Sequence, residues 1–284
     1  MSATAVLLLS CPDQRGVVAA TSDFVFRNGG NIVSAQQHVD EPSGVFFQRV
    51  EFTLEEFSLR PVDIPVGFAE IQQRFGMHVD LRFNTTPQRV AILASKQPHC
   101  LYDLLTRWRS GELPVDLRAV ISNHPDHGDA CEFFDTEYHH LPVTAATKTY
   151  QETEALRILA KHDVELVVLA RYMQILSAEF CSAYPCRIIN IHHSFLPAFV
   201  GAKPYHQAHE RGVKLIGVTA HYATADLDQG PIIEQDVVRV SHGDSPEELA
   251  RKGRDLEVAV LARAVRAHVQ HRILVFGRKT VVFD

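Results

Sequence analysis

The chain of 284 residues is long enough for two ordinary domains, and its hydrophobic content of 46% allows each of them a buried core. Its 28 Lys and Arg against 34 Asp and Glu give a net charge of −6 without a basic stripe, which disfavours a nucleic-acid partner. The apolar run at its start lacks a basic region, and no segment nears the roughly 20 apolar residues of a membrane span, so we expect a cytoplasmic protein.

The cysteines are five in number and scattered in spacing. They are Cys11, Cys100, Cys131, Cys181 and Cys186. This pattern suits neither a disulfide framework nor a C-x-x-C metal site, so we expect buried or unused free thiols.

The first 84 residues predict strands and helices in the order βαββαβ. The predicted strands are 6–10, 31–39, 45–52 and 78–83, and the predicted helices are 16–28 and 66–75. This order is typical of a ferredoxin-like sandwich, with both helices on one face of the sheet. Glycines 29 and 30 supply a left-handed end to the first helix. We expect one domain at 1–84, a polar linker at 85–88 and a second domain at 89–284.

From Arg89 onward, predicted strands alternate with predicted helices. The strands are 89–95, 116–123 and 164–171, the helices are 99–108, 151–162 and 246–268, and a hairpin follows at 273–283. Near-continuous apolar runs such as Leu166 to Ala170 are typical of parallel strands that are buried on both faces. The pattern predicts an α/β fold with an open, mostly parallel, Rossmann-like sheet, whose site lies at the carboxyl ends of the strands.

Polar side chains end one apolar strand, at Asn190 and His192 in the stretch NIHHSFLP. Residues two apart on an extended strand point to the same face, so an amide donor and an imidazole can converge on one carbonyl oxygen. The pair by itself also fits a hydrogen-bonded strand end with no catalytic role.

A second loop, DLDQGP, adds a carboxylate after the predicted strand VTAHY. An aspartate in such a turn is usually only a turn former. With Asn190 and His192, however, Asp228 completes a set of an oxyanion donor, a titratable ring and a carboxylate that can orient the ring or hold a water. This set suits the transfer or hydrolysis of an acyl group without a covalent intermediate.

The stretches NIHHSFLP, GAKPYHQAHERGVKLIGVTAHY and DLDQGP stand in the order found in the folate-dependent formyltransferase superfamily, which the chain resembles. Within it, the chain is most similar to the formyltetrahydrofolate deformylases, over essentially its whole length, because CPDQRGVVAATSDFVFRNGGNI resembles the opening of an ACT domain. The resemblance implies an enzyme that hydrolyses 10-formyltetrahydrofolate to formate and tetrahydrofolate without a separate cofactor. This reaction would feed formate to purine synthesis and balance one-carbon folate pools.

Carried over residue by residue, the resemblance implies catalytic roles for Asn190, His192 and Asp228. It implies folate contacts along 169–176 and in the loop 225–230. The residues that it assigns to substrate binding are Arg171, Tyr172, Met173, Ile175, Lys203, His221 and Gly230. Two alternatives stay open, because an arginine after a buried strand often only solvates the strand end, and the loop around Lys203 also suits a simple turn into a helix.

One departure separates members of the superfamily. The transferases that formylate glycinamide ribonucleotide cradle its phosphate with a glycine-rich loop after their first sheet strand. The corresponding loop here, ASKQPH at 94–99, contains no glycine. We therefore expect no phosphate cradle, no nucleotide amine acceptor, and water as the nucleophile.

The expected mechanism has water, held by Asp228, attack the formyl carbon while His192 and Asn190 donate hydrogen bonds to the oxygen that becomes negative. For Asp228 to act as the base, its pKa should be raised by burial or by a proton network with His192.

Several histidines stand close together in the sequence and raise the question of zinc. They are His192, His193, His206, His209 and His221. No H-E-x-x-H motif or cysteine pair accompanies them, and the acyl chemistry needs no Lewis acid, so we expect no metal.

For the N-terminal domain, the resemblance implies pairing with another copy and an amino-acid site near Asp13, Gly29, Gly30 and Asn31. It suggests methionine and glycine as opposing effectors, and a homotetramer. The alternative is a domain that serves only assembly.

Three functions are therefore weighed: a hydrolase, a formyltransferase to another amine, and an amino-acid sensor with an inactive catalytic half. The glycine-free loop favours the hydrolase over the transferase. The presence of Asn190, His192 and Asp228 together argues against the inactive form.

Overall fold

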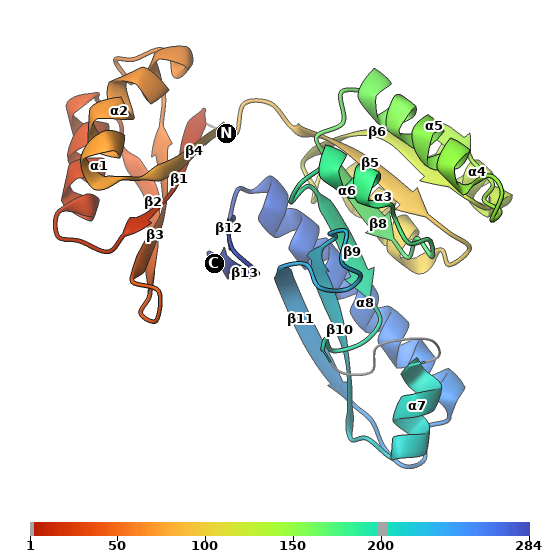
Figure 1. Cartoon of the computed structure of the whole chain (residues 1–284). Coiled ribbons are helices and arrows are strands. Elements are labelled where there is room, and N and C mark those ends of the chain that lie inside the picture. The colour runs from red at the N-terminus through yellow and green to blue at the C-terminus, as the bar shows by residue number, and fades with distance from the viewer. Residues whose placement is uncertain (1–2, 198–203) are drawn as a thin grey trace. The chain divides into compact units, whose positions relative to one another are not determined.

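The computed structural model describes residues 3–197 and 204–284 and divides the chain into two compact units (Figure 1). The N-terminal unit comprises the chain up to Pro87 together with Gln270–Phe276 and Val281–Asp284, and the C-terminal unit comprises Gln88–Val269 and Gly277–Thr280. The division after Pro87 falls in the expected linker. The expected extent of the second domain to residue 284 differs from this division, because most of the C-terminal hairpin groups with the N-terminal unit.

The N-terminal unit has the expected βαββαβ order. Its strands are β1 (Thr4–Pro12), β2 (Ile32–Asp40), β3 (Val45–Thr53) and β4 (His78–Phe83), and its helices are α1 (Val17–Arg27), the 3-10 turn η1 (Pro61–Asp63) and α2 (Ile64–Phe75). The strands form an antiparallel sheet in the order β2-β3-β1-β4. Gly29, with a φ of 78°, follows α1 in the left-handed conformation predicted for it.

Both faces of strand β1 are buried, which explains why the C-terminal segment belongs to this unit. Alternate residues of β1, Leu7 and Leu9 among them, pack under α1 and α2. The intervening residues Val6 and Leu8 face the other side, where they form a cluster with Phe47, Leu274 and Phe283. The last residues of the chain therefore supply the cover that the open face of this sheet needs.

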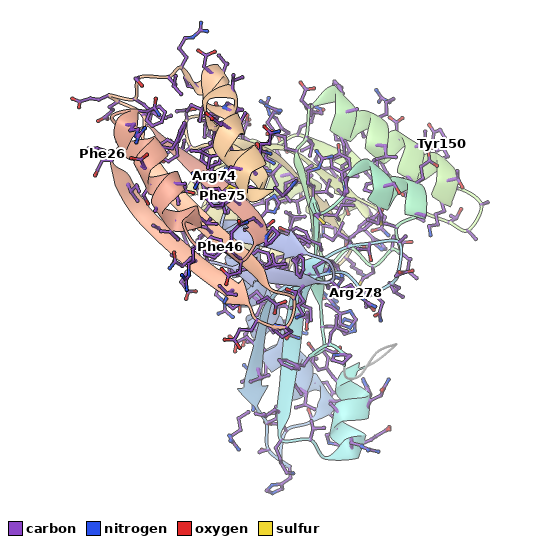
Figure 2. The ribbon with its side chains drawn as sticks, turned by 60° about the vertical axis from the view of Figure 1, so that its left-hand side comes forward. Phe26, Phe46, Arg74, Phe75, Tyr150 and Arg278 are labelled. Atoms are coloured by element: carbon purple, nitrogen blue, oxygen red, sulfur yellow. The ribbon has the colours of Figure 1, made fainter. Side chains whose placement is uncertain are left out.

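Aromatic side chains of the N-terminal unit differ in their direction (Figure 2). Phe46 and Phe75 belong to the core between the sheet and the helices. Phe26 on α1 instead points outward and is 79% exposed. An apolar ring with this exposure offers a surface that another chain can cover.

The C-terminal unit is built on a seven-stranded sheet in the order β11-β10-β9-β8-β5-β6-β7. The strands are β5 (Gln88–Ala94), β6 (Val115–Ser122), β7 (Tyr138–His140), β8 (Leu166–Ala170), β9 (Ile188–His192), β10 (Leu215–Tyr222) and β11 (Ile232–Arg239). Pairing is parallel from β9 to β7 and antiparallel for β10 and β11. The expected mostly parallel sheet is confirmed.

Helices cover this sheet on both faces. They are α3 (His99–Arg109), η2 (Pro125–His127), α4 (Gly128–Phe133), α5 (Lys148–Lys161), α6 (Ala178–Ala183), α7 (Pro204–Arg211) and α8 (Pro246–Val269). Helices α5 and α6 share a core with β5, β6 and β8, whereas α8 packs on β10 and β11 and contacts α3. The short strands β12 (Ile273–Phe276) and β13 (Lys279–Val282) form the C-terminal hairpin. Among the described residues, no helix combines the length and apolar character that crossing a membrane requires.

The strand order places the site. The chain builds outward from β5 to β6 and β7, then returns to β8 and β9 on the other side of β5. Open sheets of this kind bind ligands at the carboxyl ends of their parallel strands.

Candidate functional site

A cavity of about 330 Å³ lies at the carboxyl ends of β8 and β9. Its polar lining includes Arg171, Asn190, His192, His193, His221 and Asp228, and its apolar lining includes Leu169, Met173, Ile175, Leu176, Cys181 and Leu227. A lining that combines polar and apolar side chains suits a ligand that has one reactive group and a broad ring system.

The three residues predicted to be catalytic meet in this cavity. Asn190 and His192 stand two apart on β9 and both line the cavity, as the strand period requires. Nδ1 of His192 lies 3.2 Å from Oδ1 of Asp228. The two side chains are 9% and 10% exposed, so their contact is shielded from bulk water. Nε2 of His192 has no hydrogen-bond partner in the described part of the chain.

His221 orients the amide of Asn190. The two residues are paired across β9 and β10, and the Asn190 amide nitrogen lies 3.2 Å from Nε2 of His221. Nδ1 of His221 lies 3.0 Å from the carbonyl oxygen of Tyr222, to which only a protonated nitrogen can donate. Nε2 then accepts from Asn190. Burial lowers the pKa of His221, which keeps the ring in this neutral form.

The charge state of Asp228 differs from the expectation. The hydrogen bond from His192 lowers the pKa of Asp228 and outweighs the opposing effect of burial. The raised pKa that a role as the base would require is therefore not found, because the neighbouring donor stabilises the carboxylate more than burial destabilises it. Asp228 also has a φ of 56°, a left-handed backbone that turns its side chain out of the loop and toward β9.

His193 adds a neutral ring beside His192. Burial lowers the pKa of His193 to about 4, and the charges of Arg171 and His192 act in the same direction. The His192 and His193 ring centroids lie 5.0 Å apart. This residue was noted in the sequence only as a candidate zinc ligand.

Most of the residues predicted to bind substrate line the same cavity. Arg171, Tyr172, Met173, Ile175 and His221 all do so. Met173 and Ile175 are exposed, as is Leu227 across the cavity, so these apolar side chains form its rim. The hydroxyl of Tyr172 instead accepts a hydrogen bond of 2.9 Å from Gln151, which ties the loop after β8 to α5.

Two predicted substrate residues are placed differently. Gly230 does not line the cavity. A Cβ at this position would lie 1.7 Å from the carbonyl oxygen of Tyr222, so glycine is needed for close packing of the loop. Lys203 lies outside the described residues.

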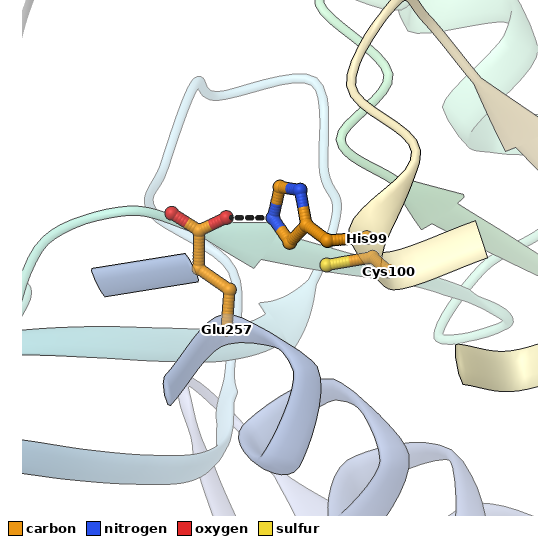
Figure 3. A group of neighbouring side chains, drawn as sticks. All are labelled: His99, Cys100 and Glu257. Carbon is orange, nitrogen blue, oxygen red and sulfur yellow. Dashed lines mark hydrogen bonds and ion pairs between the residues drawn. The ribbon is translucent and has the colours of Figure 1, made fainter. Parts of the chain in front are cut away.

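A buried carboxylate that the sequence did not reveal stands behind the cavity. Glu257 on α8 is 1% exposed, and its Oε2 lies 2.6 Å from Nε2 of His99 and 3.4 Å from Nε of Arg171. Its Oε1 accepts a hydrogen bond of 3.0 Å from the hydroxyl of Tyr205. Figure 3 shows this carboxylate facing the His99 ring at the start of α3, with Cys100 beside it. A glutamate on the apolar face of a helix was the signal that could have found it.

The contacts around Glu257 determine the charge states of its carboxylate and of the neighbouring Cys100 thiol. Burial opposes ionisation of Glu257, but the hydrogen bond from His99 and the charge of Arg171 outweigh it and lower the pKa of Glu257. Burial and the nearby Glu257 raise the pKa of the Cys100 thiol, which stays protonated. The cluster is therefore a carboxylate neutralised by its own donors.

Two groups of side chains among the described residues have metal-ligand atoms within reach of one another. They are His99, Cys100 and Glu257, and Glu137, His139 and His162. In the first group the guanidinium of Arg171 already contacts the carboxylate, and the thiol is protonated. Neither group contains a histidine that the sequence singled out for zinc.

The residues predicted to bind an effector do not meet within one N-terminal unit. The N–H of Asp13 donates to the carbonyl of Gly44 at one end of β1, whereas the N–H of Asn31 donates to Thr53 Oγ1 at the other end. Nine residues of β1 separate the two ends by roughly 26 Å at the usual rise of a strand. Gly29 and Gly30 lie with Asn31, so a shared site would need a second copy of the chain.

Comparison with known proteins identifies relatives over the whole chain. The family described as Formyl transferase matches residues 88–265. The formyltetrahydrofolate deformylase of Synechocystis sp. is 54% identical over 99% of this chain and 98% of its own length. That of Escherichia coli K12 is 39% identical over 98% of this chain and 97% of its own length.

Solved structures agree with these relatives. The crystal structure of a formyltetrahydrofolate deformylase from Pseudomonas syringae has a TM-score of 0.97 at 48% identity, covering 100% of this chain and 95% of that one. A glycinamide ribonucleotide transformylase from Symbiobacterium toebii has a TM-score of 0.67 at 34% identity, covering 72% of this chain and 98% of that one.

Proposed function

Because the chain belongs to the formyltetrahydrofolate deformylase family and hydrolyses 10-formyltetrahydrofolate to formate and tetrahydrofolate, we propose that Asn190, His192 and Asp228 carry out this reaction with water as the nucleophile. The observation that carries the assignment is the 3.2 Å contact between His192 Nδ1 and Asp228 Oδ1 inside a cavity that Asn190 also lines. One formyl group can reach all three side chains there.

The polar groups have separate tasks. Nε2 of His221 accepts a hydrogen bond from one N–H of the Asn190 amide, so the other N–H can donate to the formyl oxygen. For His192 to donate from Nε2 as well, its ring has to be protonated on both nitrogens, and the ionised Asp228 would hold such a ring. The oxygen that becomes negative is then stabilised by two donors.

Asp228 binds the attacking water in this mechanism, and His192 relays the proton. Because the pKa of Asp228 is lowered, its carboxylate is a hydrogen-bond acceptor and a weak base. The water proton passes through the Asp228 and His192 pair to the folate nitrogen as the C–N bond breaks. The products are formate and tetrahydrofolate.

The apolar rim supports folate as the ligand. Met173, Ile175 and Leu227 present exposed apolar surface around the polar groups, and surface of this kind is usually covered by a ligand or partner. We assign these three side chains to contacts with the ring system of the substrate. Arg171 and Tyr172, at the end of β8, line the same cavity.

The test is formate release by the purified protein with 10-formyltetrahydrofolate and no added amine. Removing one oxyanion donor costs about a hundred- to a thousandfold in rate. We expect Asn190→Ala to lower kcat by that factor while KM changes little. A variant that loses substrate binding while its turnover at saturation is unchanged would make the role of Asn190 structural.

For the N-terminal unit we propose an ACT domain that senses amino acids between copies of the chain. The βαββαβ order and the exposed Phe26 favour a unit that pairs. The separation of Asp13 from Asn31 favours a site completed by a second copy. We further propose a cytoplasmic homotetramer that supplies formate to purine synthesis, with methionine and glycine acting in opposite directions.

The measurements for this unit are light scattering and titration calorimetry. A tetramer whose deformylase rate responds in opposite senses to methionine and glycine supports the proposal. A monomer that binds neither amino acid contradicts it.

A further inference from the structure

Ser95, the first residue of the loop after β5, has its hydroxyl and carbonyl groups hydrogen-bonded within the protein. The hydroxyl of Ser95 accepts a hydrogen bond of 2.9 Å from the N–H of Met173 and donates one of 2.6 Å to Asn123. The carbonyl oxygen of Ser95 lies 2.5 Å from Nε2 of His127. At the end of the loop, the ring of His99 is engaged by Glu257. These side chains brace the loop against its neighbours.

The start of α3 already has an anion beside it. The first residues of an eleven-residue helix carry partial positive charge, which favours a negative group there. Glu257 supplies one, because its carboxylate reaches His99 in the first turn (Figure 3). Since its pKa is lowered, this carboxylate is ionised.

The same carboxylate fixes one wall of the cavity. Arg171 follows β8 with a φ of 58°, lines the cavity and contacts Glu257 at 3.4 Å. Tyr205 also donates to Glu257, and its ring centroid lies 6.3 Å from that of His193, another lining residue. Gly253 leaves room for the Tyr205 hydroxyl, since a Cβ there would lie 1.9 Å from it.

We propose that Glu257 is an internal anion that occupies the position in which an acceptor's anionic group would bind, and that it holds Arg171 as the wall that keeps amines from the formyl carbon. The ionised carboxylate repels a phosphate, and the guanidinium of Arg171 is already in contact with it. Water, small and neutral, is the nucleophile left. This inference rests on the proposed use of water at Asn190, His192 and Asp228.

The charge is tested by Glu257→Gln, which keeps the shape and removes the anion. The guanidinium of Arg171 then stands near the start of α3 without its counter-charge, so the variant should bind inorganic phosphate. We expect about 10 mM phosphate to raise its Tm by about 3 °C and to leave the wild type unchanged. The matched control is Glu247→Gln, which should respond like the wild type. Glu247 is an exposed carboxylate in the first turn of α8, the helix that also carries Glu257.

The wall is tested separately by Arg171→Gly, a change that the left-handed backbone at this position favours. With glycinamide present, the formyl C–N bond to folate breaks, a new C–N bond to the amine forms, and the amine proton goes to the folate nitrogen. We expect the ratio of formylglycinamide to formate to rise at least tenfold over the wild type. Arg171→Lys, which keeps a long cation, should retain the wild-type ratio.

The outcomes separate the inference from the proposed mechanism, because phosphate binding needs no folate and a product ratio does not depend on the amount of active enzyme. A folded Glu257→Gln protein with no phosphate response overturns the role of the internal anion. An unchanged product ratio in Arg171→Gly, or complete loss of turnover, overturns the role of the wall. If Glu257→Gln does not fold, the product ratio alone decides.

Discussion

Two of the imidazole–carboxylate pairs in the C-terminal unit, His192 with Asp228 and His99 with Glu257, differ in what else they bind. His192 meets Asp228 at the cavity surface, and its Nε2 is left without a partner among the described residues. Glu257 meets His99 in the interior, where Arg171 and Tyr205 also contact it. Both carboxylates have a lowered pKa. Neither a shifted pKa nor a ring nitrogen without a partner distinguishes the two pairs, because Nδ1 of His99 also lacks a partner among the described residues. The difference is that His192 and Asp228 line the cavity and are open to a ligand, whereas His99 and Glu257 do not line it.

The largest effect on the reaction rate should come from a change in the open pair, His192 and Asp228, which lines the cavity. Asp228→Asn keeps the size of the side chain but removes the carboxylate charge beside Nδ1 of His192. We expect formate release to fall by about 10³- to 10⁴-fold, as for other residues that orient a catalytic histidine. Single-turnover kinetics measure this drop, with a folded state verified by circular dichroism. A loss of less than tenfold would remove Asp228 from the chemistry.

A change in the closed pair, His99 and Glu257, should lower the stability of the fold more than it lowers the reaction rate. Breaking a buried ion pair by removing one charge costs about 3–5 kcal/mol, because the remaining charges lose their partner. We expect Glu257→Gln to lose about this much in urea unfolding, with formate release within about tenfold of the wild type. If the rate falls as far as in Asp228→Asn, the distinction between the pairs disappears.

A smaller loss is expected from Tyr205→Phe. This change removes one hydroxyl donor to the Glu257 carboxylate and keeps the ring beside His193. A hydrogen bond to a charged group contributes about 1.5–3 kcal/mol. Urea unfolding should show that loss, and the double variant with Glu257→Gln should show less than the sum, because the two changes remove one interaction.

The pH dependence of stability sharpens the comparison further. The pKa of Glu257 is lower in the folded chain than its ordinary value of 4.5, so folding favours the ionised form. Its contribution is complete above that ordinary value and is lost as the pH falls through the lowered one. Wild-type Tm should therefore drop more steeply below about pH 4.5 than the Tm of Glu257→Gln. Parallel curves would show that Glu257 is not a stabilising carboxylate.

The sequence was sufficient where the signal is local or periodic. The alternation of apolar residues predicted the βαββαβ unit and the parallel strands, because strand period and helix period are set by backbone geometry. The spacing of Asn190 and His192 predicted their common face for the same reason. The order of the motifs predicted the deformylase family, which the relatives support.

Other features depend on residues that are distant in the chain. The balance that lowers the pKa of Asp228 depends on a contact across 36 positions, from β9 to the loop after β10, which no local pattern contains. The Glu257 cluster joins α8 to the loops after β5 and β8. The grouping of Leu274 and Phe283 with β1 likewise arises only when the sheet exists.

The sequence by itself determined the two kinds of unit, the family and the three residues proposed for catalysis, because each follows from periodicity or from a short run of letters. Only the tertiary structure decided that Asp228 lines the cavity and that Glu257 is enclosed by His99, Arg171 and Tyr205. The groups around a charge are set by packing between distant parts of the chain. For that reason Asp228 is assigned to the reaction, and Glu257 is assigned to the support of Arg171.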